Sequence, residues 1–283
     1  MIFINPTQHD NIDIRDHIAY PGLNYMVDPD LVNDFMKTRR TGGVESIGFL
    51  FGKSKHRPDV ELVLVNKLIN KKLKSWVGIS DKVYKKNYKM AEHLFGMHIF
   101  PILLHPQSNG TVRLQSKNPK CEPEIRTNYL KHPLDVQRLA DAIIFIDENL
   151  TRTTEFEKIR PVLYPAPICD NLPYKSREYW EKALTKLVVS FGDYMGGNKM
   201  GARSDTSSVV DCGFRIRGLK NVRIVDASVI PVTMSGHVEA TVVMLAEKAA
   251  KIIKRTYKRS SCYNDKSRER RNQLNYKQLS CYK

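Results

Sequence analysis

The sequence predicts a protein of mixed α and β structure, because strand-like and helix-like segments both occur along the chain. Residues 58–65 (PDVELVLV) are apolar and β-branched, a composition typical of a strand. Residues 97–116 contain two strand-like runs around a Ser-Asn-Gly turn at 108–110, a pattern that predicts a β-hairpin. Apolar residues at helical spacing predict helices over residues 134–150, 177–190 and 240–257.

Turn residues and local composition predict the segments between these elements. Residues 13–27 predict a loop that leads into a short strand, and Pro29–Met36 predicts a helix. The lysine-rich residues 66–76 predict an exposed connection. Partial alternation predicts a strand and turn over 209–218, and the apolar residues 222–225 (VRIV) predict a short buried strand.

The composition is that of a globular protein with a strongly basic end. Of its 283 residues, 41% are hydrophobic, and the net charge is +16, which suits nucleic acid, an anionic membrane surface or an anionic cofactor as partner. From Lys251 onward there are eleven Lys or Arg residues and two acidic residues. Residues 258–283 are therefore predicted to be a disordered basic tail, and no nucleic-acid-binding motif accompanies it. Salt-dependent binding of nucleic acid or an anionic surface through residues 251–283 stays open as a weaker hypothesis.

Several classes of protein are excluded by sequence pattern. The five cysteines contain no CxxC pair and are odd in number, which argues against a zinc site and a disulfide framework. His93 and His98 have no further metal-ligand pattern around them. No apolar run is long enough to span a membrane, and the first residues lack the basic and apolar regions of a secretory signal.

A glycine-rich stretch near residue 200 and the strand–loop–helix that follows it form the main candidate site. Residues 190–205 (SFGDYMGGNKMGARSD) contain four glycines, among them Gly196, Gly197 and Gly201, and glycine permits a close approach of backbone to a ligand. Farther on, the predicted strand ends at Asp226, and a loop with His237 leads to the last helix. Backbone N–H groups at Val238 and Glu239 would offer positive partial charge to an anionic ligand. The residues alone leave open both a cofactor pocket and a purely structural strand–loop–helix.

A series of motifs in this order resembles the C-terminal half of the glucose–methanol–choline (GMC) oxidoreductases, in particular their insect glucose-dehydrogenase-like branch. The resemblance extends from about residue 13 to 257. It rests on Asp16-His17, Pro21-Gly22-Leu23, Ser46-Ile47-Gly48, Pro58–Glu61, His105–Pro119, Asn128–Asp135, Met195–Gly201 and the stretches 222–231, 235–241 and 244–253.

This resemblance implies an FAD-dependent enzyme that takes a hydride from the CH–OH carbon of an alcohol or sugar. It also implies an α+β fold, in which an antiparallel-sheet substrate domain with helices is joined to the C-terminal portion of a split FAD-binding α/β domain whose N-terminal dinucleotide fold is missing. The expected division is a remnant of the FAD-domain connection at 1–18, the substrate domain at 19–190, the C-terminal FAD-domain portion at 191–257 and the tail at 258–283. Family members are often secreted, so the lack of a signal leaves localisation open.

The resemblance also implies roles for five positions, beside the histidine position discussed next. Asp226 and Ala227 would lie along the ribityl–phosphate part of FAD, and the backbone at Val238 and Glu239 would face the pyrimidine edge of the flavin. Catalysis in the family uses a histidine that acts as a base on the substrate hydroxyl, together with a His or Asn partner. His237 occupies the partner position.

Two departures from the family pattern weaken the expected activity. The strand and GxGxxG motif with which the family begins are absent here, so the chain is expected to be truncated. The family pattern H-x-x-G-T-C-x-M-G corresponds to residues 193–201, with Asp193 at the position of the histidine.

The change to Asp193 predicts weak or no dehydrogenase activity. A histidine accepts a proton near neutral pH, and its imidazolium stabilises negative charge on the reduced flavin. A carboxylate reverses the second effect, because like charges about 4 Å apart cost about 4 kcal/mol at an effective dielectric of about 20. Glu239 would add another negative charge. Two hypotheses therefore stay open, an oxidoreductase of low activity and a non-catalytic relic or interaction protein.

Overall fold

The structure is a computed structural model that describes residues 12–15, 18–19, 23–26, 44–52, 56–65, 69–76, 78–92, 94, 96–164 and 171–257. Contacts divide the chain into two compact units. The first unit is formed within residues 1–197 and 230–238, and the second within residues 198–229 and 239–283. Several features of the sequence lie outside the described residues, among them Asp16-His17, Pro21-Gly22, Pro29–Met36, His93 and the basic tail at 258–283.

The first unit is built on an antiparallel sheet of seven strands. These strands are β2 (Ile18–Ala19), β3 (Leu23–Met26), β4 (Val44–Leu50), β5 (Val60–Val65), β6 (Gly96–Leu103), β9 (Val162–Tyr164) and β10 (Val189–Ser190). Strand β6 lies at the centre, with β5 along one edge and both β2 and β3 along the other. Strand β4 flanks β5, β9 flanks β3 and β10 flanks β2. The predicted α+β class with an antiparallel sheet and helices is confirmed.

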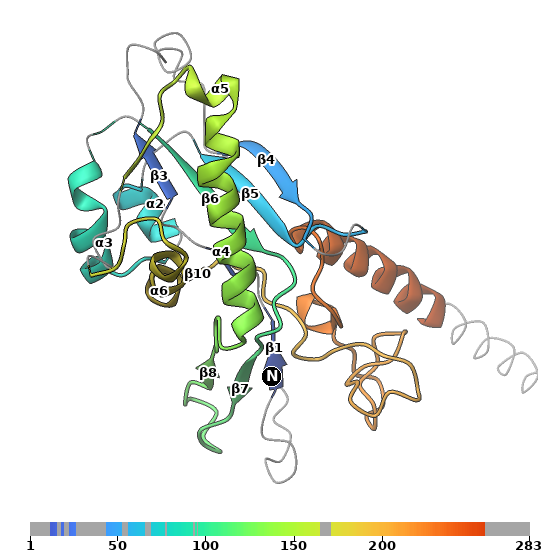
Figure 1. Ribbon diagram of the computed structural model, residues 1–283. Coiled ribbons are helices and arrows are strands. Elements are labelled where there is room, and N and C mark those ends of the chain that lie inside the picture. Colours follow the sequence, from blue (N-terminus) through green and yellow to red (C-terminus); the bar gives the residue numbers. More distant parts are fainter. Residues whose placement is uncertain are drawn as a thin grey trace, which may run out of the picture. The chain divides into compact units, whose positions relative to one another are not determined.

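Alternation along β6 divides the hydrophobic interior into two cores. Ile99 and Leu103 point to one face of the sheet, where they pack with helices α4 (Pro133–Glu148) and α6 (Arg177–Leu187). Helix α4 crosses this face, as Figure 1 shows. Phe100 and Ile102 point to the opposite face and pack with residues of helix α3 (Asp81–Asn87) and its flanks. The sheet is thus buried on both sides at its centre.

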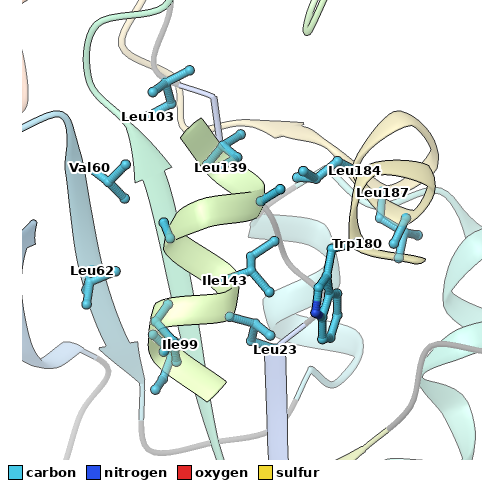
Figure 2. Packing of buried hydrophobic residues seen from close by; sticks show 14 of the residues in the cluster. Leu23, Val60, Leu62, Ile99, Leu103, Leu139, Ile143, Trp180, Leu184 and Leu187 are labelled. Carbon is cyan, nitrogen blue, oxygen red and sulfur yellow. The ribbon is translucent and has the colours of Figure 1, made fainter. Parts of the chain in front are cut away.

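The first core is a continuous contact between helices and strands (Figure 2). Trp180 and Leu184 of α6 face Leu139 and Ile143 of α4, with Leu23 of β3 alongside. Each fully buried side chain of this kind contributes about 1.5–3 kcal/mol relative to exposure. The core therefore fixes α4 and α6 on the sheet, and it sets the place where the chain after α6 emerges.

Local signals explain where the two long helices begin. His132 Nδ1 accepts the N–H of Leu134 at 3.2 Å, and Pro133 supplies the φ angle of the first turn of α4. Ser176 Oγ accepts the N–H of Tyr179 at 3.1 Å at the start of α6. The 3-10 helix η3 (Leu150–Arg152) and helix α5 (Thr154–Glu157) follow α4. The predicted helices over 134–150 and 177–190 are confirmed, although the last residues of the second form β10.

The predicted hairpin over residues 97–116 is wrong. Strand β7 (Gly110–Arg113) belongs to a separate three-stranded sheet, between β1 (Ile12–Ile14) and β8 (Glu124–Arg126). Both edges of β6 are already paired, so β7 finds no free edge beside it. A local turn signal predicts that two strands are connected, but not that they pair with each other.

The lysine-rich residues 66–76 are not simply an exposed connection. Residues 71–76 form helix α2 (Lys71–Trp76), which precedes α3 and the 3-10 helix η2 (Lys89–Ala91). Buried Ile69 belongs to the second core just before α2. Lysine and leucine are good helix formers, and this propensity together with the anchor at Ile69 explains the helix.

The second unit has few regular elements. Its helices are the 3-10 helix η4 (Ala227–Val229) and a helix over residues 239–257, which confirms the last predicted helix. The predicted strands at 209–218 and 222–225 are not formed, because these residues make only isolated bridges and 222–225 are half-buried. Four buried residues form its core, namely Val210, Phe214, Val229 and Ala249. No helix in the described part of the chain has the length and apolar character needed to cross a membrane.

Candidate functional site

Asp193 and His237, which are 44 residues apart in the chain, meet directly in the first unit. His237 Nδ1 lies 2.7 Å from Asp193 Oδ2, and the second carboxylate oxygen accepts the N–H of Val238 at 3.2 Å. The distance of 2.7 Å is typical of a charge-assisted hydrogen bond. Both predicted catalytic positions therefore belong to one cluster.

Glu61, a residue of β5, completes this cluster on the other side of the imidazole. Its Oε1 lies 3.3 Å from His237 Nε2. The Glu61 side chain is only 2% exposed, the Asp193 side chain 9% and the His237 side chain 39%. The histidine ring thus lies between two buried carboxylates and keeps one part of its surface open.

Phe191 fixes the plane of the His237 ring. The two rings stack with centroids 5.3 Å apart and planes inclined by 25°. Phe191 follows β10 and also contacts Phe100 of the sheet in an edge arrangement. The position of the imidazole is therefore set by the second core as well as by its polar partners.

The glycine-rich stretch explains how Asp193 reaches this position. Gly192 has φ +89° and Gly196 has φ +90°, a conformation that side-chain-bearing residues rarely adopt. Between them, the backbone of buried Met195 exchanges two hydrogen bonds of 2.9 Å with Arg15. These two turns and the bridge direct the carboxylate of Asp193 toward His237.

His105 holds the segment at 230–238, which carries His237, through contacts with two residues that precede His237. This buried histidine follows β6, and its Nδ1 lies 3.1 Å from Thr233 Oγ1 while its Nε2 lies 2.9 Å from Ser235 Oγ. The loop after His105 is fixed by the buried carboxylate of Asp135, which accepts the N–H groups of Gln107 and Ser108 at 2.8 and 2.7 Å. The residues around His105 therefore act as a positioning framework.

The charge around the imidazole changes its affinity for a proton. Partial burial of His237 opposes the charged form, but the hydrogen bond to Asp193 and the negative charge of Glu61 outweigh it, so the pKa of His237 is raised above its usual value. By contrast, burial alone lowers the pKa of His98 on β6 to about 3. His98 is thus a neutral residue of the sheet interior.

The predicted cofactor positions have different surroundings. Exposed Asp226 precedes η4 and accepts the N–H of Ser228 at 2.8 Å through Oδ1. Ala227 is the first residue of η4, and Glu239 is the exposed first residue of the last helix. The N–H of Val238 is donated to Asp193. Within the described residues, no group of three His, Cys, Asp or Glu side chains is arranged to hold a metal ion.

Comparison with known proteins identifies the family. Residues 106–246 match the sequence model of the GMC oxidoreductase family. The chain belongs to the GMC oxidoreductases. It is 31% identical over 209 residues to glucose dehydrogenase [FAD, quinone] of Drosophila melanogaster, a match that covers 73% of this chain and 32% of that protein. Ecdysone oxidase of Spodoptera littoralis is 32% identical over 187 residues, which cover 64% of this chain and 29% of that enzyme.

Solved GMC oxidoreductase structures share the fold. A formate oxidase from Aspergillus oryzae superposes with a TM-score of 0.69 at 20% identity and covers 89% of this chain and 48% of its own. Pyridoxine 4-oxidase from Mesorbium loti gives a TM-score of 0.64 at 20% identity, with 88% and 44% covered. The chain therefore spans about a third of the curated relatives it matches and under half of these solved chains.

Three residues of the site were not predicted as functional, namely Glu61, Phe191 and His105. The signal for Glu61 was present, because a single acid in the apolar run VELVLV is costly to bury without a partner. His105 and Glu61 both belong to stretches used for the family resemblance, without a role attached. Only the fold shows that they approach the segment at 230–238.

Proposed function

We propose that this chain is the C-terminal part of an FAD-dependent oxidoreductase that oxidises the CH–OH group of a small alcohol or sugar with low efficiency. The observation that carries the proposal is the direct contact between Asp193 and His237, the two positions to which the family resemblance assigns catalysis. The relatives named glucose dehydrogenase [FAD, quinone] and oxygen-dependent choline dehydrogenase 1 support the same reaction class.

The residues present fit the cofactor in part. Asp226 and Ala227 would hold the ribityl–phosphate region, since Asp226 is exposed and Ala227 is only half-buried. Val238 and Glu239 would lie at the pyrimidine edge, but the Val238 N–H is donated to Asp193 and Glu239 brings a negative charge. FAD supplies the acceptor for a hydride when it is bound. The residues of this chain therefore fit the ribityl–phosphate region of FAD better than the pyrimidine edge of the flavin.

In the proposed reaction, the substrate carbon gives up a hydride and its hydroxyl gives up a proton, which leaves a carbonyl group. His237 is the residue of this chain that would receive the hydroxyl proton, with Asp193 as the group that orients the ring. Asp193 is itself a poor replacement for a histidine base, because an ionised carboxylate disfavours the negative charge that develops nearby. These two roles explain why low activity is proposed.

A second function is favoured by one observation. Both ring nitrogens of His237 face a carboxylate within 3.3 Å, so the histidine already has partners before any substrate arrives. This arrangement suits a non-catalytic protein that keeps the GMC substrate-domain scaffold for another purpose.

The flavin content of the natural protein separates the two functions. The protein that contains this chain is purified and its visible absorption is recorded without oxygen, before and after addition of a panel of alcohols and sugars. The proposal expects bound flavin that is bleached slowly by at least one of these compounds, and more slowly still in His237→Ala. Protein without flavin, or flavin that no alcohol or sugar reduces, would favour the non-catalytic function.

A further inference from the structure

The geometry of the Asp193–His237–Glu61 cluster limits which of its atoms can carry protons. Carboxylate oxygens accept hydrogen bonds and cannot donate them, whereas a neutral imidazole has one N–H and one lone pair. If only Nδ1 carried a proton, the lone pair of Nε2 would face Glu61 Oε1 at 3.3 Å. If only Nε2 carried a proton, the lone pair of Nδ1 would face Asp193 Oδ2 at 2.7 Å. Only a ring with both protons satisfies two ionised carboxylates.

We propose that Glu61 is a positioning residue that, together with Asp193, keeps His237 doubly protonated, so that the site acquires a base only when a proton leaves Nε2. This inference concerns the same site as the proposed oxidoreductase and rests on that function for its catalytic consequence. The charge state of the ring, however, is a property of the three side chains themselves. It can therefore be measured without flavin or substrate.

The contacts of Asp193 place the proton on the ring. One oxygen of Asp193 accepts the Val238 N–H while the other faces His237, which is the pattern of a carboxylate with both oxygens used as acceptors. The alternatives are a protonated Asp193 that donates to Nδ1 and a protonated Glu61 that donates to Nε2. The ordinary pKa of imidazole lies about 2 units or more above those of aspartate and glutamate, which favours the proton on the imidazole.

The remaining neighbours of the ring agree with a cation. Phe191 presents its ring at 5.3 Å from the imidazole, within the range where an aromatic face attracts a positive charge. Asp193 and Glu61 are both acidic, and both raise the pKa of His237. The negative charges come from two separate elements, β5 and the loop after β10.

The contacts of the two ring nitrogens indicate that Nε2 releases its proton before Nδ1 does. Nδ1 is held in the shorter contact of 2.7 Å, whereas Nε2 has the longer contact of 3.3 Å. The His237 side chain is also 39% exposed, which leaves a path for the proton. As the pH rises through the raised pKa of His237, Nε2 becomes the free base, and Asp193 and Glu61 together set the pH at which this happens.

The test is a titration of the His237 ring in the natural protein by NMR with histidine-selective labelling, with the signal assigned by its loss in His237→Asn. The wild type is expected to titrate above the usual histidine midpoint, and Glu61→Gln and Asp193→Asn each to lower that midpoint. Asp141→Asn, which removes an exposed carboxylate on α4, is the matched control and is expected to leave it unchanged. A wild-type midpoint at or below the usual value overturns the proposal even if both variants fail to fold.

The same variants give a functional readout where the protein carries flavin. Below the midpoint, kcat/KM for the best alcohol is expected to rise about tenfold for each pH unit, because only the deprotonated ring accepts the hydroxyl proton. In Glu61→Gln this rise is expected to move to lower pH along with the NMR midpoint. A pH profile that stays in place while the midpoint moves overturns the catalytic part of the proposal. A protein without flavin contradicts the proposed function and leaves the NMR result to decide the charge state.

Discussion

The surroundings of His105 and those of His237 use the same side chain in opposite ways. Both histidines hold the segment at 230–238, and both have a partner at each ring nitrogen. The partners of His105 are the hydroxyls of Thr233 and Ser235, which donate or accept as required, so a neutral ring is satisfied in either tautomer. The partners of His237 are carboxylates, which only accept. The difference between the two histidines therefore lies in the chemistry of their partners, because only the carboxylates around His237 favour a charged ring.

The largest expected effect comes from breaking the framework on the His105 side. Asp135→Ala removes the acceptor for the buried N–H groups of Gln107 and Ser108 and is expected to lower the free energy of unfolding by about 3 kcal/mol. Denaturant unfolding of the wild type and the variant measures this loss in free energy. Asp141→Ala on the same helix loses only an exposed ion pair with Arg177 and is expected to cost less than about 1 kcal/mol. Equal costs for the two variants would refute the anchoring role of Asp135.

A smaller loss is expected when His105 itself is removed. His105→Ala deletes two hydrogen bonds to hydroxyls and is expected to lower the free energy of unfolding by about 2 kcal/mol. Thr233→Val keeps the shape and removes one partner, so about half of that loss is expected. If His105→Ala left stability unchanged, the hydroxyl contacts would not anchor the segment.

The contribution of charged His237 to stability is expected to be small but to depend on pH. Because the folded-state pKa of His237 is raised, its contribution to stability is complete below the usual value of 6.5 and is lost as the pH rises through the folded-state pKa. The stability difference between wild type and Glu61→Gln should therefore shrink with rising pH across that window. The ring is more than a third exposed, so the pH-dependent part should stay below about 1 kcal/mol. A difference that grows with pH would show that the sign is wrong.

The smallest expected effect is on stability and comes from Glu239, which is exposed, in contrast to buried Glu61. Glu239→Gln removes an exposed charge from the first turn of the helix over 239–257, where a negative charge interacts favourably with the helix dipole. A loss of about 0.3–0.5 kcal/mol is expected in denaturant unfolding. A loss above about 1 kcal/mol would indicate that Glu239 has a stronger partner than the helix terminus.

Sequence patterns predicted the parts of the fold that depend on local signals. The helix over 134–150 has a proline at its first position and a clear apolar face, and the helix over 177–190 has a serine cap, so both were identified. The hairpin at 97–116 failed because strand pairing is decided by which edges other strands occupy. The strand at 222–225 failed because apolar composition does not show whether a partner strand exists.

The candidate site could be predicted only in part, because sequence patterns show motifs along the chain but not contacts between distant segments. Asp193 and His237 were found through the order of motifs along the chain, and their contact supports that pairing. Glu61 lies 132 residues from Asp193 in sequence, and only the pairing of β5 with β6 carries it to the second core. A buried acid in an apolar strand indicates that a partner must exist, but the sequence does not name the partner.

The most direct measurement of the central claim is the nitrogen-15 NMR spectrum of the His237 ring at neutral pH. We expect Nδ1 and Nε2 both to show the chemical shifts of protonated nitrogens, as two carboxylate partners require. A spectrum with one protonated nitrogen and one bearing a free lone pair would contradict it. In that case His237 would be an ordinary neutral histidine, and Glu61 would have no part in setting its charge.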